Sequence, residues 1–135
     1  MKTVLFICVN NARRSQMAEA IFKKLSKDVA ISAGVEPADN VDENMIAVLK
    51  ELGIDTSNLR PKKLTESMLE KADKIITFKC YDAIPEKLRN KTENWDIGAE
   101  SVNQLQDVYS LEYLRKVRDQ IGEKVERLIR NLGAT

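Results

Sequence analysis

Four short apolar stretches along the chain have the length and composition of buried strands. The first is "TVLFIC" (residues 3–8), whose nearly continuous run of apolar side chains is typical of a strand covered on both faces. The pattern returns in "VAISAG" (29–34) and in "DKIITFKC" (73–80), which ends on Cys80. A shorter stretch, "ENWDI" (93–97), indicates a fourth strand.

Between these strands the apolar side chains recur at helical spacing. After Ser15, the residues Met17, Ile21 and Leu25 follow one another every four positions, which predicts a helix. The same spacing predicts three more helices, over residues 42–53, 65–72 and 111–133. Strands that alternate with helices are typical of βαβ units. The pattern therefore predicts an α/β fold, with a parallel sheet flanked by helices.

Length and composition favour a single domain over residues 1–135. A chain of this length can bury a core without disulfides or a structural metal. Its 22 Lys and Arg residues balance 21 Asp and Glu residues, so no global field recruits nucleic acid or an anionic membrane. No apolar run approaches the ~20 residues of a membrane span, and the first run is too short for a signal peptide. We expect a cytoplasmic monomer that binds neither nucleic acid nor membrane.

The chain has two cysteines and no histidine. These counts exclude Cys–His catalysis and a disulfide framework, and two thiols alone make a poor zinc site, so no metal or cofactor is expected. Cys8 and Cys80 each stand at the carboxyl end of a predicted strand. Because parallel sheets bind ligands beyond the carboxyl ends of their strands, we expect the two thiols to share one edge of the sheet.

The stretch "CVNNARRS" (residues 8–15), here named the Cys8 loop, joins the first strand to the first helix. A tight turn of this kind points backbone N–H groups inward and makes an anion-binding concavity. Arg14 offers a planar fork for two oxygens of phosphate or arsenate, and Ser15 can donate to the cysteine sulfur or cap the helix. These donors favour the thiolate of Cys8, which attacks a tetrahedral oxyanion. The alternative is a buried strand-end cysteine beside a solvated Arg13–Arg14 pair.

The order of Cys, five residues, Arg and Ser between a strand and a helix resembles the C-x5-R-[ST] loop of the low-molecular-weight protein tyrosine phosphatase superfamily. Within it, "RSQMAEA" resembles the arsenate reductase branch, because the phosphatases usually follow Arg-Ser with proline. "SAG", "LKELGID", "NWDI" and the long last helix also fall in family order. The resemblance implies a four-stranded parallel sheet, with Cys8 as the nucleophile and Arg14 holding the anion. The loop residues expected to bind the substrate are Val9, Asn10, Asn11, Ala12, Arg13, Arg14 and Ser15.

Cys80 matches the second cysteine of the arsenate reductase branch. The resemblance implies that Cys8 attacks arsenic, that the Cys80 thiolate then attacks the Cys8 sulfur, and that arsenite leaves while a disulfide remains. Thioredoxin-coupled members carry a third cysteine a few residues further on, which this chain lacks. Thioredoxin, glutaredoxin or a small thiol would then have to reduce the Cys8–Cys80 disulfide directly. A buried structural thiol is the alternative role of Cys80.

One part of the family pattern is broken. The general acid of the family is an aspartate, which in the reductase branch lies in "W-x-x-x-D-P", but this chain has Ala99 at that place and Glu100 instead of the proline. Asp96 and Glu100 are nearby substitutes, although Asp96 can equally cap a turn. A positioned acid speeds release of a phenolate by ~10²–10⁴-fold, whereas arsenate releases water or hydroxide and carries protons on its own oxygens. The loss therefore counts more heavily against an ester phosphatase.

A second set of residues is expected to brace the loop. Asn11, Glu19 and Ser32 match three positions of potassium-binding reductases, while Lys62 occupies the fourth position, which is acidic in those proteins. The Lys62 ammonium could replace the ion. Ordinary loop hydrogen bonding is the alternative for these residues.

The sequence thus predicts an arsenate reductase that works through Cys8, Arg14 and Cys80. A phosphotyrosine or small phosphoester phosphatase, with Asp96 or Glu100 as a displaced acid, is the first alternative. The second alternative is a non-catalytic protein that binds oxyanions.

Overall fold

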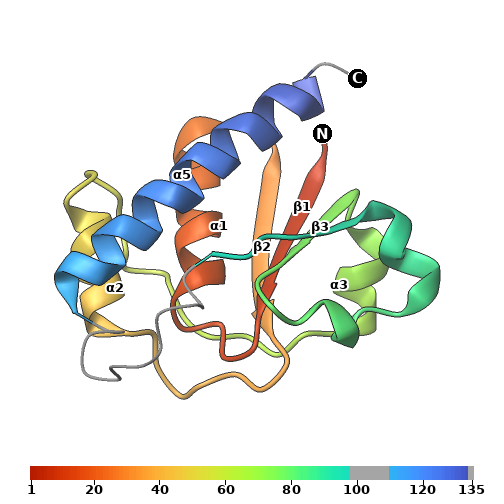
Figure 1. The fold of residues 1–135 in the computed structure, drawn as a ribbon, viewed down its shortest axis with the longest axis horizontal. Helices are drawn as coiled ribbons and strands as arrows, with labels where there is room; N and C mark the ends of the chain where they lie inside the picture. The colour runs from red at the N-terminus through yellow and green to blue at the C-terminus, as the bar shows by residue number, and fades with distance from the viewer. Residues whose placement is uncertain (98–109, 134–135) are drawn as a thin grey trace.

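The computed structural model of the chain describes residues 1–97 and 110–133 (Figure 1). Its sheet has four strands, all parallel, in the order β2-β1-β3-β4. The bounds of the strands are β1 Thr3–Cys8, β2 Val29–Gly34, β3 Lys74–Thr77 and β4 Thr92–Asn94. Cys8 therefore ends one of the two central strands, as the apolar pattern predicted.

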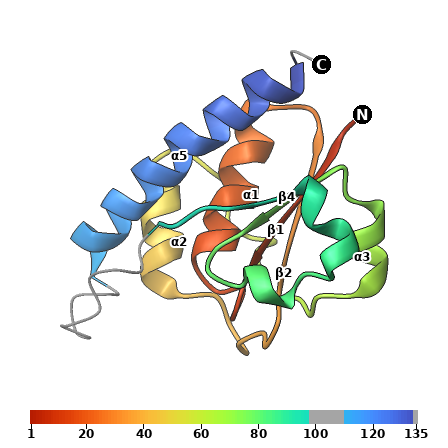
Figure 2. The same ribbon diagram turned by 45° about the vertical axis from the view of Figure 1, so that its right-hand side comes forward.

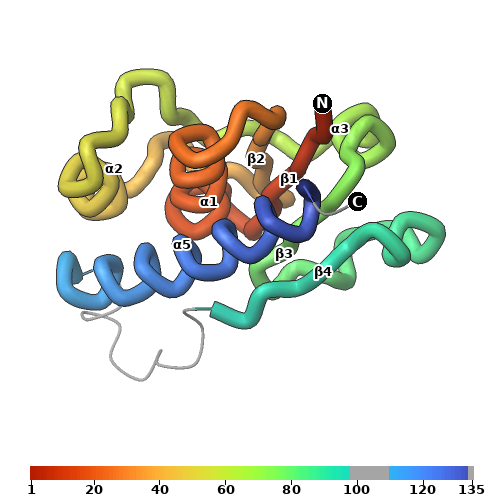
Figure 3. Tube along the Cα trace, turned by 90° about the horizontal axis from the view of Figure 1, so that it is seen from above, coloured from red at the N-terminus to blue at the C-terminus, as the bar shows by residue number. Residues whose placement is uncertain are grey.

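The helices lie on both faces of this sheet. Their bounds are α1 Arg14–Leu25, α2 Glu43–Lys50, α3 Glu66–Lys71 and α5 Leu111–Gly133. α5 packs against both α1 and α2, and the three helices gather on one side of the strands in the view from above (Figure 3). α3 lies on the opposite side of the strands from α2 (Figure 2). The predicted α/β architecture is confirmed.

The side chains of β1 alternate between two cores. Val4 and Phe6 belong to the core shared with α1, α2 and α5, whereas Leu5 and Ile7 belong to the core shared with α3. All four side chains are fully buried. Successive residues of a strand point to opposite faces, so a strand with helices on both faces needs a continuous apolar run.

The third strand is shorter than the sequence predicted. β3 ends at Thr77, so Cys80 lies three residues beyond the strand and not at its end. Beyond the strand, Lys79 adopts a left-handed φ of 64° and donates its N–H to Asn94 Oδ1 at 3.0 Å. Beyond Cys80 the chain enters two 3₁₀ helices, η1 (Tyr81–Ala83) and η2 (Glu86–Lys91).

Smaller differences concern the ends of other elements. β4 covers Thr92–Asn94, so Trp95, which was predicted inside the strand, follows it. α2 begins after Asp42, whose side chain accepts the Met45 N–H at 3.0 Å and caps the helix. Within the described residues, no helix is long and apolar enough to cross a bilayer.

α2 and α5 are joined through the carboxylate of Glu51. Arg115 Nη2 lies 2.7 Å from one oxygen of Glu51, and Arg118 Nη1 lies 2.7 Å from the other. Arg118 Nη1 also donates to the Val48 carbonyl of α2 at 2.9 Å. The hydrogen bonds from Arg115, and then those from Arg118, lower the pKa of Glu51 from 4.5 to about 2.

This pKa shift makes the contribution of Glu51 to stability dependent on pH. Because the folded-state pKa is depressed, the ion pairs stabilise the fold above pH 4.5, and that stabilisation disappears as the pH falls towards 2. We expect Glu51→Gln to lower the free energy of unfolding at neutral pH, and the deficit to shrink below pH 4.5. Urea unfolding at several pH values measures this deficit in the free energy of unfolding. Glu126→Gln, exposed on α5, is the matched control and should change little; a Glu51→Gln deficit that is constant with pH would contradict this account.

Candidate active site

The backbone of the Cys8 loop turns its carbonyl groups outward. Four loop carbonyls accept N–H groups from the segment that follows β2: Cys8 from Val35, Val9 from Glu36, Asn10 from Ala38 and Ala12 from Asp42. In a planar trans peptide, the C=O and the next N–H point in opposite directions. The N–H groups of residues 9, 10, 11 and 13 therefore point into the loop. The turn thus forms a cradle of N–H donors at the amino end of α1, suited to an anion.

Two hydrogen-bond partners converge on the sulfur of Cys8. The backbone N–H of Asn11 donates to Cys8 Sγ at 3.2 Å, and Ser15 Oγ lies 2.9 Å from the same sulfur. Asn11 reaches this position through a left-handed backbone with φ of 51°, a conformation that asparagine tolerates better than most residues. Cys8 itself is buried, with 4% of its surface exposed.

The direction of the hydrogen bond between Ser15 and Cys8 follows from the neighbouring side chain of Asn11. The backbone N–H of Lys62 can only donate, and it lies 2.9 Å from Asn11 Oδ1, so that atom is the amide oxygen. The amide nitrogen of Asn11 therefore donates to Ser15 Oγ at 2.7 Å. Ser15 Oγ accepts this hydrogen bond and keeps its own hydrogen to donate; towards a thiolate of Cys8, which carries no hydrogen, the hydroxyl is the donor. Both contacts with Cys8 Sγ are then donors, an arrangement that suits a negatively charged sulfur.

Arg14 begins α1 and turns its guanidinium towards the end of the sheet. Its Nη1 donates to the Ile97 carbonyl at 3.2 Å, and its guanidinium carbon lies 5.8 Å from the centre of the Phe78 ring. These contacts come from the chain segments that follow β3 and β4, so the guanidinium is held at the same end of the sheet as Cys8. Its planar fork retains further N–H donors for an oxyanion.

Cys80 lies near Cys8 but belongs to the other face of the sheet. Its sulfur is 3.4 Å from the carbonyl oxygen of Ile7, the residue before Cys8. Its side chain packs in the core that contains Leu5 and Ile7, whereas Cys8 packs in the core with Phe6. Both cysteines are free thiols. Burial, above all, raises the pKa of the Cys80 thiol to about 11; the backbone hydrogen bond from Phe78 opposes this rise, the nearby Cys8 adds to it, and Arg14 opposes it.

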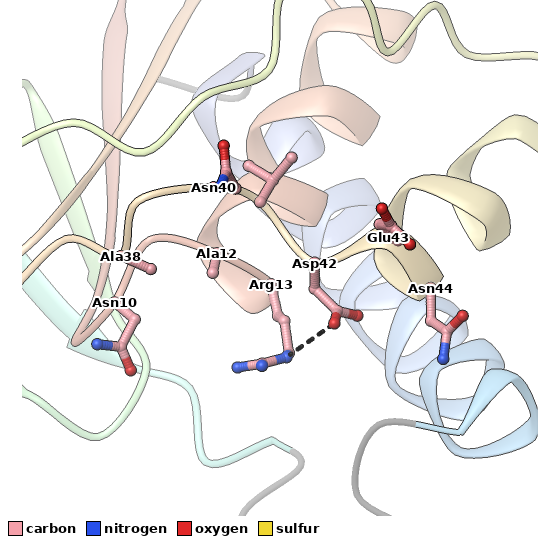
Figure 4. A pocket seen from close by; sticks show the side chains of 9 residues that line it. Asn10, Ala12, Arg13, Ala38, Asn40, Asp42, Glu43 and Asn44 are labelled. Carbon is pink, nitrogen blue, oxygen red and sulfur yellow. Dashed lines mark ion pairs between the residues drawn. The ribbon is translucent and has the colours of Figure 1, made fainter.

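The remaining predicted loop residues surround the cradle. Val9 is 40% exposed, Ala12 is buried, and Asn10 donates its amide to the Glu36 carbonyl at 2.9 Å. Arg13 Nε lies 3.8 Å from Asp42 Oδ1 across an open depression of about 620 Å³ (Figure 4). The depression is lined by Asn10, Ala12 and Arg13 of the loop and by residues 38 and 40–44.

Asp96, one of the two predicted substitutes for the missing acid, is exposed and paired with a lysine. The Asp96 side chain is 72% exposed and pairs with Lys79, whose Nζ lies 3.6 Å from Asp96 Oδ1. Ala99 and Glu100 lie outside the described residues. Among the described residues, no cluster of three or more Cys, Asp or Glu side chains could hold a metal ion.

The residues matched to the potassium site do lie together. Lys62 Nζ is 3.6 Å from Glu19 Oε1 and 3.5 Å from Ser32 Oγ, and Ser32 donates to the same carboxylate. Glu19 is 5% exposed, and its other oxygen pairs with Lys23 at 2.7 Å. The Lys62 ammonium thus lies beside the carboxylate; its replacement of an ion stays a prediction.

Two residues that support the loop were given no role by the sequence analysis. The fully buried Gln16 places its side-chain nitrogen 3.1 Å from the Asn11 carbonyl, 3.0 Å from Asn11 Oδ1 and 2.8 Å from the Arg60 carbonyl. Gly34 lies so close to the loop that a Cβ there would stand 2.9 Å from both Asn11 Cβ and the Val9 carbonyl oxygen. Gln16 lies away from the helical face predicted from Met17, Ile21 and Leu25, so the apolar spacing did not indicate that it is buried. No sequence signal distinguishes Gly34 from an ordinary strand-ending glycine.

Comparison with known proteins gives consistent matches over nearly the whole chain. Residues 3–135 match the family described as low molecular weight phosphotyrosine protein phosphatase. An arsenate reductase of Halalkalibacterium halodurans is 33% identical over 130 residues, which cover 93% of each chain. A solved arsenate reductase in the phosphate-binding state has a TM-score of 0.82 at 33% identity, covering 97% of this chain and 98% of that one. The YwlE arginine phosphatase of Geobacillus stearothermophilus has a TM-score of 0.82 at 26% identity, covering 99% and 94%.

The close approach at Gly34 predicts that a single methyl group will damage the loop. In Gly34→Ala the new Cβ would press on backbone atoms of residues 9 and 11, which cannot move without displacing the donors around Cys8. We expect roughly 1–3 kcal/mol of destabilisation and at least a tenfold loss of affinity for phosphate, measured by urea unfolding and calorimetric titration.

Gly122→Ala in α5 is the matched control, because nothing lies within 4 Å of its Cβ position. Alanine in a helix should stabilise the protein by about 0.5–1 kcal/mol and leave phosphate affinity unchanged. Unchanged phosphate affinity in Gly34→Ala would refute the role of this close approach.

Proposed function

Because the chain belongs to the low molecular weight phosphotyrosine protein phosphatase family, we propose that it reduces arsenate to arsenite with Cys8 and Cys80. One observation carries the proposal: the hydrogen bonds from Asn11 and Ser15 both point at the sulfur of Cys8. They supply a nucleophilic thiolate without a histidine, which this chain lacks. The similarity to arsenate reductases supports arsenate as the substrate.

The first step is attack of the Cys8 thiolate on arsenate held in the cradle. The N–H groups of the loop and the Arg14 guanidinium bind the oxygens and stabilise the charge that develops on them. An S–As bond forms and an As–O bond breaks, and the departing oxygen leaves as water after taking a proton already carried by the arsenate. This step needs no separate general acid, which suits a chain whose Asp96 is exposed and paired with Lys79.

The second step is attack of the Cys80 thiolate on the Cys8 sulfur. The S–S bond forms, the S–As bond breaks, and its electron pair stays on arsenic, which is thereby reduced from As(V) to As(III). Disulfide formation needs Cα atoms within ~4.4–6.8 Å and suitably directed side chains. Because Cys80 packs on the face opposite to Cys8, the segment after β3 has to move around the end of β1. Leaving its buried site also removes the burial that raises the pKa of Cys80.

An external thiol then reduces the disulfide. With two cysteines, the chain has no third thiol to carry the oxidation elsewhere, so thioredoxin, glutaredoxin or a small thiol acts on the Cys8–Cys80 pair directly. A reaction that consumes thiols requires a reducing compartment, and we propose the cytoplasm, with the protein acting as a monomer.

A phosphatase is the second candidate function. The similarity to a solved arginine phosphatase favours it, because the same loop with Cys8 and Arg14 suits a phosphoenzyme. In that reaction Cys8 attacks phosphorus, and Cys80 has no part in turnover.

Assays of the purified protein separate these functions. We expect arsenite release with consumption of thiols, tested side by side with the thioredoxin and the glutaredoxin systems. Cys8→Ser and Cys80→Ser should each reduce arsenite release to the uncatalysed level, because each sulfur makes or breaks a bond in the reaction. Aryl-phosphate hydrolysis that survives Cys80→Ser would instead support the phosphatase. Tight phosphate binding with neither turnover would support a binding protein.

A further inference from the structure

The two sulfurs have unequal polar surroundings. Cys8 Sγ faces two donors, the Asn11 N–H at 3.2 Å and the Ser15 hydroxyl at 2.9 Å. Cys80 Sγ faces an acceptor, the Ile7 carbonyl at 3.4 Å, has one backbone donor at Phe78, and packs in a core of apolar side chains. Donors stabilise a thiolate, whereas an acceptor and an apolar pocket disfavour it. The two thiols are therefore unequal as leaving groups.

The donors around Cys8 belong to the fixed part of the site. Asn11 is held by the Lys62 N–H and by Gln16, and the loop carbonyls are bound by the segment after β2. Cys80, in contrast, follows the left-handed Lys79, which is exposed, as is Asp82 two residues after Cys80. When a disulfide joins the sulfurs, Cys8 keeps its donors, and Cys80 is the partner that has changed its surroundings.

We propose that the external thiol which regenerates the enzyme attacks the Cys80 sulfur of the Cys8–Cys80 disulfide, so that Cys8 leaves as the thiolate. The inference rests on the proposed arsenate reduction, which produces this disulfide. In thiol–disulfide exchange, the sulfur that is more stable as a thiolate leaves faster, and the incoming thiolate attacks the other sulfur.

The exchange balances with one external thiol for each sulfur. The first thiolate forms a bond to Cys80 Sγ, the S–S bond to Cys8 breaks, and its electron pair goes to Cys8. A second thiolate then attacks the external sulfur of the mixed disulfide, and Cys80 leaves and takes a proton. Two external thiols become one disulfide, and the two electrons restore both cysteines. The Cys8 thiolate is regenerated first, while Cys80 still carries the mixed disulfide.

The position of a trapped mixed disulfide tests the proposal. The protein is oxidised with diamide, treated briefly with glutathione and quenched with excess N-ethylmaleimide. The two cysteines then fall in separate tryptic peptides, residues 3–13 and 80–87. We expect glutathione on residues 80–87 and N-ethylmaleimide on residues 3–13, with the reverse pattern at least about tenfold rarer.

Ser15→Ala tests whether the donors around Cys8 cause the preference of glutathione for Cys80. Removing one of the two donors should lower the preference for Cys80 severalfold, whereas Ser67→Ala, exposed on α3, should leave it unchanged. Glutathione mainly on residues 3–13, or an unchanged preference in Ser15→Ala, would overturn the inference.

The test is independent of arsenate. If arsenite is released but glutathione marks Cys8, only the present inference fails. If glutathione marks Cys80 but no arsenite is released, the inference about exchange stands and the proposed function fails. If diamide forms no Cys8–Cys80 disulfide, both fail.

Discussion

The orientation of one side-chain amide, that of Asn11, sets the chemistry of the whole site. The backbone N–H of Lys62 can only donate, so the Asn11 side-chain atom that it contacts must be the amide oxygen. The Asn11 amide nitrogen donates to Ser15 Oγ, and with Cys8 as a thiolate the Ser15 hydroxyl donates in turn to the sulfur. A chain without histidine in this way surrounds its cysteine sulfur with neutral donors and backbone dipoles.

The parallel sheet brings the parts of this series together. β1 and β2 lie side by side, so their carboxyl ends place Gly34 against Asn11. The segment after Pro61 then pairs with Gly34, whose N–H donates to the Lys62 carbonyl and whose carbonyl accepts the Leu64 N–H. This pairing holds the Lys62 N–H against the Asn11 side chain. The same sheet gives the two cysteines different surroundings, because they pack on opposite faces at the end of β1.

The sequence was sufficient for the architecture and for the identity of the loop, because both depend on local pattern. Continuous apolar runs predicted the strands, and the C-x5-R-S spacing predicted a sulfur among donors at the start of a helix. It was insufficient where contacts between distant segments decide the outcome. The role of the Lys62 ammonium stays a prediction, and no local pattern indicated that the backbone N–H of Lys62 orients Asn11. The end of β3 depends on the contact between Lys79 and Asn94, which are distant in the sequence. The sequence therefore placed Cys80 at the correct end of the sheet but did not show on which face its side chain packs. Asp96 was a candidate by distance in sequence alone, and Lys79 pairs with it.

The activation of Cys8 is most directly tested by its alkylation rate at mildly acidic pH. In a Cys80→Ser background, iodoacetamide reports on Cys8 alone, first in the folded protein and then in urea. The account predicts alkylation at least on the order of tenfold faster in the folded protein, because only the fold aligns the donors that keep the sulfur ionised. Added sulfate should slow the folded protein by occupying the cradle. Equal rates in the folded and unfolded protein, with no effect of sulfate, would contradict the account.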